Sequence, residues 1–324
     1  MDKLTAIRRP VEQELTAYKE LFDAALAHED DFLGQALDYV RRRQGKMMRP
    51  LLVVLMAKEL GKVSVNSLRS AVTLELLHTA SLVHDDVVDE SGERRGQRSV
   101  NAVYDNKVAV LVGDYLLSTS LLQAAQTNNI DVVEIISRLG GTLSEGEVYQ
   151  LANIRKEHIS EEAYFHIIYH KTAALFAACA ELGAISAGGS ADYVARAKRF
   201  GELVGLCFQI RDDIFDYYED SKIGKPTGND MLEGKLTLPV IYAIQHADNE
   251  RVTQLAARVK SGEASAAEIA ELVDYTKSHG GIEYAERRMR ELRNEALQLL
   301  DAWQNAEVRE SLRGYIDFVV DRDL

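Results

Sequence analysis

The chain has 324 residues, 46% hydrophobic and 27% charged, the composition of a globular protein that can bury a large core. Its 38 Lys and Arg residues against 51 Asp and Glu give a net charge of −13, which excludes a general binder of nucleic acid or anionic lipid. An anionic substrate would therefore need local arginines or metal ions. Only four prolines interrupt the chain, which favours helices throughout.

Helical spacing of apolar residues begins at the N-terminus and continues through residues 1–43. A loop at 44–50 leads to a helix that runs to Leu60, and Gly61 ends it. Further helices are predicted at 64–89, 108–125, 130–154, 160–187 and 191–218, with four or five more in 235–324. No β-hairpin pattern, repeat or linker divides the chain. We therefore predict a single all-α domain over residues 1–324, a helical bundle around a central apolar cavity.

Targeting and redox features are sparse. The N-terminal segment is too charged for a signal peptide, and no apolar run reaches the ~20 residues of a membrane span. The closest is the alanine-rich stretch 172–189, which contains Glu181 and is expected to be a buried core helix. The two cysteines, Cys179 and Cys207, lie in apolar helical patterns and form no disulfide framework. We expect a cytoplasmic protein without a membrane span.

A cluster of charge ends the predicted helix at 64–89. Asp85 and Asp89 stand one turn apart with Asp86 beside them, and like charges at that spacing weaken a helix by roughly 0.2–0.5 kcal/mol. A cation between them would remove that repulsion, and oxygen ligands suit Mg²⁺ when phosphates complete its shell. Three arginines suited to phosphate oxygens follow: Arg94, Arg95 and Arg98. Alone, such a cluster is as well explained by a solvated helix end.

A second cluster of the same kind makes the functional interpretation the stronger one. Asp212, Asp213 and Asp216 repeat the DDxxD pattern near the end of the predicted helix at 191–218, and the loop beyond carries further charge: Lys225, Asp230 and Lys235. Two such clusters facing one cavity would hold a diphosphate through bridging Mg²⁺. A diphosphate held in this way is a good leaving group, and the carbocation that it leaves requires a dry, apolar cavity.

With both clusters in place, the chain resembles the trans-isoprenyl diphosphate synthases (polyprenyl synthetases). The likeness extends over about 44–243 and is greatest to bacterial long-chain members of the octaprenyl diphosphate synthase type. It implies an all-α fold of the isoprenoid synthase type, a homodimer and several Mg²⁺ ions in each active site. It also implies two substrates, isopentenyl diphosphate and an allylic diphosphate primer.

The resemblance assigns roles to individual residues. The metal ligands it implies are Asp85, Asp89, Asp212 and Asp216. The contacts to isopentenyl diphosphate are Lys46, Arg49, His78 and Arg95, and those to the allylic diphosphate are Arg94, Lys225 and Lys235. Near the reacting carbons, and also in contact with substrate, are Lys171, Thr172 and Gln209. The candidate catalytic set is Asp85, Asp86, Asp89, Lys171, Thr172, Gln209 and Asp212.

One loop departs from the family pattern. The family usually has Gly-Gly-Lys-Arg before its Arg-Pro pair, and here the order is Gln44-Gly45-Lys46-Met47. The candidate anion contacts Lys46 and Arg49 are retained. We assign no binding role to the charge that Met47 removes.

The implied reaction adds isopentenyl units head to tail to a farnesyl-type primer by ionisation, carbon–carbon bond formation and proton loss. No side chain resembles a dedicated base, so we expect the departing diphosphate to accept the proton. Ala80 and Ser81 lie one turn behind Asp85, and Leu77 one turn further. Short-chain members carry an aromatic residue in this region. Small residues there imply a long all-trans product, heptaprenyl to octaprenyl, suited to a quinone side chain.

Three alternatives remain open at this point. A short-chain synthase making farnesyl or geranylgeranyl diphosphate would use the same motifs. A class I terpene cyclase shares one DDxxD motif, but its second site is an Asn/Ser/Glu triad that is not found around residues 209–220. A non-catalytic partner subunit usually lacks some of the aspartates or arginines, and here none is lost.

Overall fold

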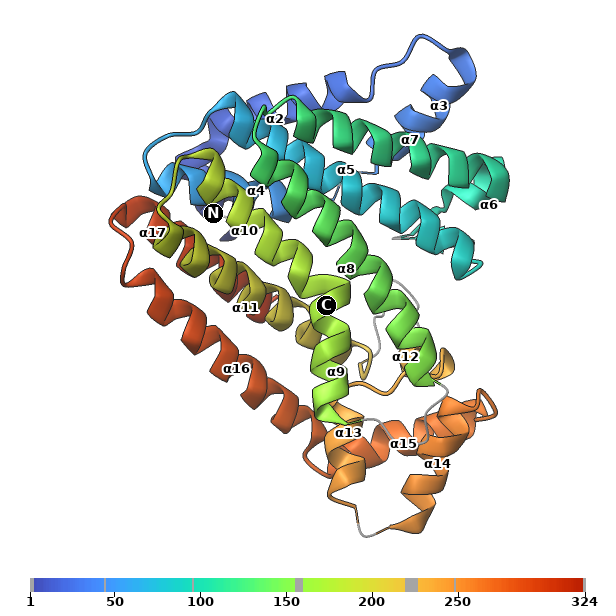
Figure 1. Cartoon of the computed structure of the whole chain (residues 1–324). Coiled ribbons are helices and arrows are strands. Elements are labelled where there is room, and N and C mark those ends of the chain that lie inside the picture. Colours follow the sequence, from blue (N-terminus) through green and yellow to red (C-terminus); the bar gives the residue numbers. More distant parts are fainter. Residues whose placement is uncertain are drawn as a thin grey trace. The chain divides into compact units, whose positions relative to one another are not determined.

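The computed structural model describes residues 3–43, 45–94, 96–154, 160–218, 227–247 and 249–322. Within these ranges nearly all regular structure is helical, so the all-α prediction is confirmed (Figure 1). The chain divides into two compact units, and each is described by itself. Unit 1 comprises Met1–Gly140, Leu175–Gly201 and Ala302–Gly314; unit 2 comprises Gly141–Ala174, Glu202–Asp301 and Tyr315–Leu324. That the chain forms a single domain stays a prediction.

The N-terminal half of the chain follows the predicted order of helices. The elements are α1 (Lys3–Arg8), η1 (Arg9–Val11), α2 (Glu12–Ala25), α3 (Asp31–Arg41), α4 (Met48–Glu59), α5 (Val65–Val88), β1 (Glu93–Arg94), β2 (Gln97–Arg98), α6 (Val100–Tyr104), α7 (Asn106–Ala125) and α8 (Ile130–Ile154). The predicted helix at 64–89 is confirmed as α5. It begins at a capping box in which Ser64 and Ser67 bond each other's backbone N–H.

The C-terminal half comprises α9 (Glu161–Ile168), η2 (Tyr169–Ala173), α10 (Ala174–Ser186), α11 (Ala191–Phe215), α12 (Asn229–Leu232), α13 (Leu238–Gln245), α14 (Glu250–Lys260), α15 (Ala266–Ser278), α16 (Gly281–Leu300) and α17 (Ala306–Val320). Five helices therefore follow residue 235 in the described ranges, as predicted. The expected helix at 160–187 is interrupted by one π-helical turn, η2. Apolar periodicity does not reveal such a turn, because it changes the spacing at only one place.

No hairpin was predicted from the sequence, and this prediction was wrong. The short strands β1 and β2 pair in antiparallel register, with Glu93 opposite Arg98 and Arg94 opposite Gln97. Gly96 supplies a φ of 73° at the turn. All four paired residues are polar, so the alternation of apolar and polar side chains on which strand prediction depends is missing.

Unit 1 is built around α4 and α5. Every residue from Leu51 to Ala57 is fully buried, and α5 packs along α4, α2 and α7. Glycine lets α10 lie close to α4, since a Cβ at Gly183 would be 2.4 Å from the Val53 carbonyl oxygen. At Gly201 a Cβ would be 2.3 Å from the Phe176 carbonyl oxygen, so α11 approaches α10 equally closely. Any side chain at either glycine would separate these helices.

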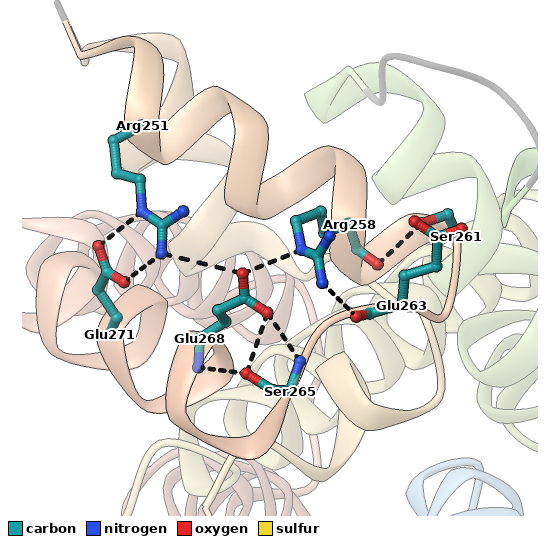
Figure 2. Close-up of polar contacts among 7 residues, drawn as sticks. All are labelled: Arg251, Arg258, Ser261, Glu263, Ser265, Glu268 and Glu271. Atoms are coloured by element: carbon teal, nitrogen blue, oxygen red, sulfur yellow. Dashed lines mark hydrogen bonds and ion pairs between the residues drawn. The ribbon is translucent and has the colours of Figure 1, made fainter.

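Unit 2 holds the helices that surround the pocket described below. α13 packs against α15 and α16, and α14 packs against α15. A polar network joins the last pair (Figure 2): Arg251 donates to Glu271 at 3.1 and 2.8 Å, and Arg258 Nε lies 2.9 Å from Glu268. Glu268 also completes a capping box with Ser265 at the start of α15. Single surface pairs contribute under about 1 kcal/mol, but together they fix the direction of α14.

One described helix, α7, is long and apolar enough to cross a membrane by length and composition alone. It packs along α5, and 44% of its most apolar window is buried. The expectation that 172–189 is the stretch closest to a membrane span was therefore wrong. That stretch contains α10, whose buried residues confirm the expected core helix.

Both cysteines are free and buried. Burial raises the pKa of the Cys207 thiol to about 12 and raises that of Cys179 further. Each thiol therefore stays protonated and unreactive at neutral pH.

Candidate active site

The first aspartate cluster lies at the C-terminal end of α5. The backbone N–H of Asp89 donates to the Asp85 carbonyl at 2.8 Å, so the last helical turn carries both carboxylates on one side. Asp85 is half-buried and Asp89 is exposed. These two carboxylates are therefore accessible to a ligand.

Asp86 follows Asp85 in the same turn but is 2% exposed. Its Oδ1 accepts from Arg94 Nε at 2.6 Å, and Asn101 donates to its carbonyl at 3.1 Å. Arg43 donates to the carbonyls of Arg94 and Gln97, which fixes the hairpin. Asp86 thus orients Arg94. This role differs from that of Asp85 and Asp89, whose carboxylates are accessible to a metal ion. The predicted contact Arg95 lies outside the described residues.

His84 stabilises this end of α5 against α7 and was not identified from the sequence. Its Nε2 lies 3.2 Å from the Val110 carbonyl oxygen and 3.4 Å from Asp114 Oδ1. A Cβ at Gly113 would be 2.2 Å from that nitrogen. Only glycine at position 113 leaves room for the imidazole, which holds the turn next to Asp85.

The other predicted residues of unit 1 lie on α4, α5 and the loop before α4. Lys46 is exposed, and Arg49 lies with its guanidinium 5.3 Å from the centre of the Phe176 ring. His78 is half-buried on α5. Met47, at the N-cap position before α4, has a φ of 50°, an unusual value for a residue with a side chain. Gln44 lies outside the described residues.

The three predicted chain-length residues lie along α5. Leu77 is 5% exposed and Ala80 is 2% exposed. Ser81 is half-buried, and its hydroxyl donates to the His78 carbonyl at 2.9 Å. A bulky side chain at Ala80 would meet a packed core, whereas one at Ser81 has more space.

The second aspartate cluster lies at the C-terminal end of α11, in unit 2. Asp216 accepts from the backbone N–H groups of Asn229 and Asp230 at 3.0 and 3.1 Å. Asp212 forms an ion pair with Arg322, whose guanidinium also lies 4.1 Å from the Phe208 ring centre. These contacts anchor Arg322 beside the cluster. A tail arginine would ordinarily be solvated instead.

A pocket of about 100 Å³ in unit 2 brings together several of the predicted residues. Its charged and amide-bearing lining includes Gln150, Asn153, Lys171, Gln209, Asp213, Asp230, Lys235 and Lys260. Lys171 Nζ lies 2.8 Å from Glu147, and Lys235 pairs with Glu233. Lys225 lies outside the described residues. The pocket thus offers three ammonium groups beside carboxylates, a suitable setting for a phosphate bridged by cations.

Lys171 and Thr172 reach this region from the π-helical turn η2. Gly146 of α8 allows the close approach, since a Cβ there would lie 2.7 Å from His170 Cβ. π-Helical turns within α-helices are frequently found at functional sites, because they redirect side chains that a regular helix would place elsewhere.

Burial changes the acidity of two carboxyl groups here. Burial, then the Asp216 charge, raises the pKa of Asp230 to about 7, while Lys235 and Lys171 oppose the rise. Burial, then Asp230, also raises the pKa of Asp213. Asp230 was noted in the sequence only as part of a charged loop, and Asp213 only as a middle residue of its cluster.

The metal ligands were predicted from paired carboxylates. In the described ranges, no three His, Cys, Asp or Glu side chains are grouped so that they could hold a metal ion by themselves. Asp85 and Asp89 nevertheless provide oxygen donors one turn apart, and Asp212 and Asp216 provide two more. Such pairs fit Mg²⁺ where phosphate oxygens and water complete the coordination shell.

Comparisons with known proteins agree on one family. The polyprenyl synthetase family model matches residues 30–276. The octaprenyl diphosphate synthase of Haemophilus influenzae is 35% identical over 93% of this chain and 91% of that protein. A solved geranylgeranyl pyrophosphate synthase from Bacteroides thetaiotaomicron is 48% identical, with a TM-score of 0.88 over 99% of this chain and 100% of that one. A polyprenyl synthase from Caulobacter crescentus CB15, complexed with calcium and isoprenyl diphosphate, is 30% identical, with a TM-score of 0.91 over 98% of both chains.

Proposed function

This chain belongs to the polyprenyl synthetase family, and on that premise we propose that it adds isopentenyl diphosphate head to tail to an allylic diphosphate. The resemblance first suggested by the two aspartate clusters is thereby confirmed. The observation that carries the proposal is the repeated arrangement of paired carboxylates at the end of a long helix, each with cationic side chains nearby. Arg94 pairs with Asp86 beside the first cluster. In the second cluster Asp212 pairs with Arg322, and Asp216 accepts from the backbone of Asp230, which lines the unit 2 pocket together with its lysines.

The side chains divide the work of this reaction. The four accessible aspartates would hold Mg²⁺, which neutralises charge on the leaving diphosphate when bound. Arg94, held by Asp86, binds allylic diphosphate oxygens, and Lys171 and Lys235 contribute positive charge in the pocket. The departing diphosphate takes the proton released after the new carbon–carbon bond forms. Support for the metal comes from the donor chemistry and from the solved relative complexed with calcium.

We propose a long product, heptaprenyl to octaprenyl, from the small side chains of Ala80 and Ser81 behind Asp85. The octaprenyl diphosphate synthase relative agrees with this length. A second candidate, a short-chain synthase, has its own support, since the solved relative at 48% identity is a geranylgeranyl pyrophosphate synthase. Residues 80 and 81 favour the longer product.

Product analysis tests the proposal. The purified chain is incubated with farnesyl diphosphate, isopentenyl diphosphate and Mg²⁺, and the dephosphorylated products are separated by chromatography. We expect long polyprenols, none without isopentenyl diphosphate, and none after chelation of the metal. A hydrocarbon from farnesyl diphosphate alone would indicate a cyclase, and an inactive purified chain would indicate a partner subunit.

The two sets of predicted substrate contacts lead us to expect two different kinetic defects. Lys46→Ala and His78→Ala should raise the KM for isopentenyl diphosphate about tenfold or more, because each loses a contact to that substrate. Arg94→Ala should instead raise the KM for the allylic substrate. Steady-state kinetics with each substrate varied in turn measures both constants. Asp86→Asn removes the charge that orients Arg94 but leaves the guanidinium, so it should raise the KM for the allylic substrate less than Arg94→Ala does. Exchanged phenotypes would show that the two sets of contacts are assigned to the wrong substrates.

We also propose a homodimer, formed through the exposed face of α7. Leu111 is 66% exposed and Leu122 is 55% exposed, three turns apart on one side of the helix. Leu111→Glu with Leu122→Glu should convert the dimer into a 36.1 kDa monomer in analytical ultracentrifugation. Val65→Glu, equally exposed on α5, should leave the dimer intact. A wild-type monomer, or a dimer unaffected by both leucine substitutions, would exclude this interface.

We propose a cytoplasmic location from the two free, buried thiols, which suit a reducing compartment.

A further inference from the structure

Four side chains of unit 2 form a continuous hydrogen-bonded chain that begins at a tyrosine with no assigned role. The Tyr164 hydroxyl donates to Asp213 Oδ2 at 2.6 Å. Gln209 Nε2 donates to Asp213 Oδ1 at 2.8 Å, and the Thr172 hydroxyl donates to Gln209 Oε1 at 2.7 Å. Tyr164 and Asp213 are 3% and 4% exposed, so water does not compete with the first bond.

The direction of these bonds follows from the chemistry of the groups. Gln209 turns its amide nitrogen to Asp213, to which it donates, so its amide oxygen is left as an acceptor. Its oxygen then faces Thr172 and accepts the hydroxyl proton. The lone pairs of Thr172 Oγ1 are consequently left for other partners, while its proton is engaged.

Tyr164 is suited to begin such a chain. Burial, followed by the charge of Asp213, raises the pKa of its hydroxyl well above the ordinary value, so the group keeps the proton that it donates. It lies on α9, whereas Asp213 and Gln209 lie on α11 and Thr172 on η2. The hydroxyl thus fixes the carboxylate from a different helix.

We propose that Tyr164 is a positioning residue for prenyl transfer: through Asp213 and Gln209 it orients the Thr172 hydroxyl so that its lone pairs are available to the bound substrates. The inference rests on the proposed function, in which Thr172 lies near the reacting carbons. An oxygen with its proton directed away presents partial negative charge to a developing carbocation. If the Thr172 hydroxyl were free to rotate, a fraction of the molecules would direct its proton toward the carbocation. The partial positive charge of that proton would destabilise the carbocation.

Tyr164→Phe tests the proposal because it removes one oxygen and retains the ring. We expect kcat to fall on the order of 10- to 100-fold while both KM values stay within about threefold, since orientation is lost and binding is not. Tyr284→Phe is a matched control: the Tyr284 hydroxyl donates to Glu161 on the same helix, also at 2.6 Å, and neither residue lines the pocket. Its kcat should be unchanged, and thermal unfolding should show both variants folded, with the larger loss of stability in Tyr164→Phe because its hydroxyl bonds a buried carboxyl group.

A double-mutant cycle separates orientation from general damage. Thr172→Val removes the hydroxyl at the end of the chain, so Tyr164→Phe in that background should lower kcat by less than about threefold. Equal losses in the two backgrounds would overturn the proposal, as would an unchanged kcat in Tyr164→Phe or equal kcat losses in the two Tyr→Phe variants. A wild-type chain that makes no prenyl product would instead overturn the proposed function itself.

Discussion

Replacing Asp85 or Asp212 with alanine is expected to reduce turnover by about 10²-fold or more, because each change removes a carboxylate that holds the diphosphate through a metal. The stability effects should differ. Asp85→Ala also relieves the repulsion between Asp85 and Asp89, which weakens this helix end by roughly 0.2–0.5 kcal/mol. Asp212→Ala leaves Arg322, 17% exposed, without its ion pair and should cost about 1 kcal/mol or more. Steady-state turnover and thermal unfolding measure the two effects.

An exposed aspartate on the same helix provides the control. Asp192 lies in the first turn of α11, the helix that carries Asp212, and Asp192→Ala should leave turnover unchanged. Near-normal turnover in either cluster variant would show that the metal ligands have been assigned wrongly. A loss restored by raising the Mg²⁺ concentration would support the assignment, since weakened coordination is then compensated by mass action.

Phenylalanine at position 80 or 81 is expected to shorten the product to farnesyl or geranylgeranyl diphosphate. A chain growing away from Asp85 passes these positions, and a ring there would block it. Ser81→Phe is the sharper variant, because Ser81 is half-buried, whereas a ring at the 2%-exposed Ala80 would overpack the core at a cost of about 1–3 kcal/mol. Chromatography of the dephosphorylated products measures the length.

Val65→Phe is the matched control for the length prediction. It adds the same ring to the same helix at a position that is 59% exposed, and it should leave product length unchanged. If the Ala80→Phe, Ser81→Phe double variant still makes the wild-type product, the chain leaves by another route and the length argument fails. A wild-type product of geranylgeranyl length would favour the second candidate instead.

Features that depend on local periodicity could be predicted from the sequence. The helix at 64–89 was placed within one residue at each end, because its apolar stripe, its Ser64 cap and its terminal charge all lie within one continuous stretch. The two aspartate clusters fall at helix ends for the same reason. Within each cluster, spacing alone could not show that Asp86 and Asp213 are buried while their neighbours stay accessible.

Features that depend on contacts distant in sequence could not be predicted. Tyr164 and Asp213 meet from different helices, and nothing in the local pattern around either residue indicates the other. The pairing of Arg322 with Asp212 likewise could not be predicted, because an arginine in the tail of a chain is usually solvated. The assigned roles of the site residues stay predictions until the variants above are measured.

The π-helical turn at Tyr169–Ala173 has a consequence for how this region tolerates change in length. A π-turn holds one residue more than the α-helical turn that it replaces, and each residue of an α-helix advances the chain by about 100°. The wide turn absorbs this extra residue, so the helix on either side of it keeps the register of a regular α-helix. Deleting one residue there would restore α-helical spacing without rotating α9, and Tyr164 would still face Asp213. The side chains within the turn, Lys171 and Thr172 among them, would be redirected instead. A three-nucleotide deletion could therefore displace the far end of the hydrogen-bonded chain while its anchor stays in place.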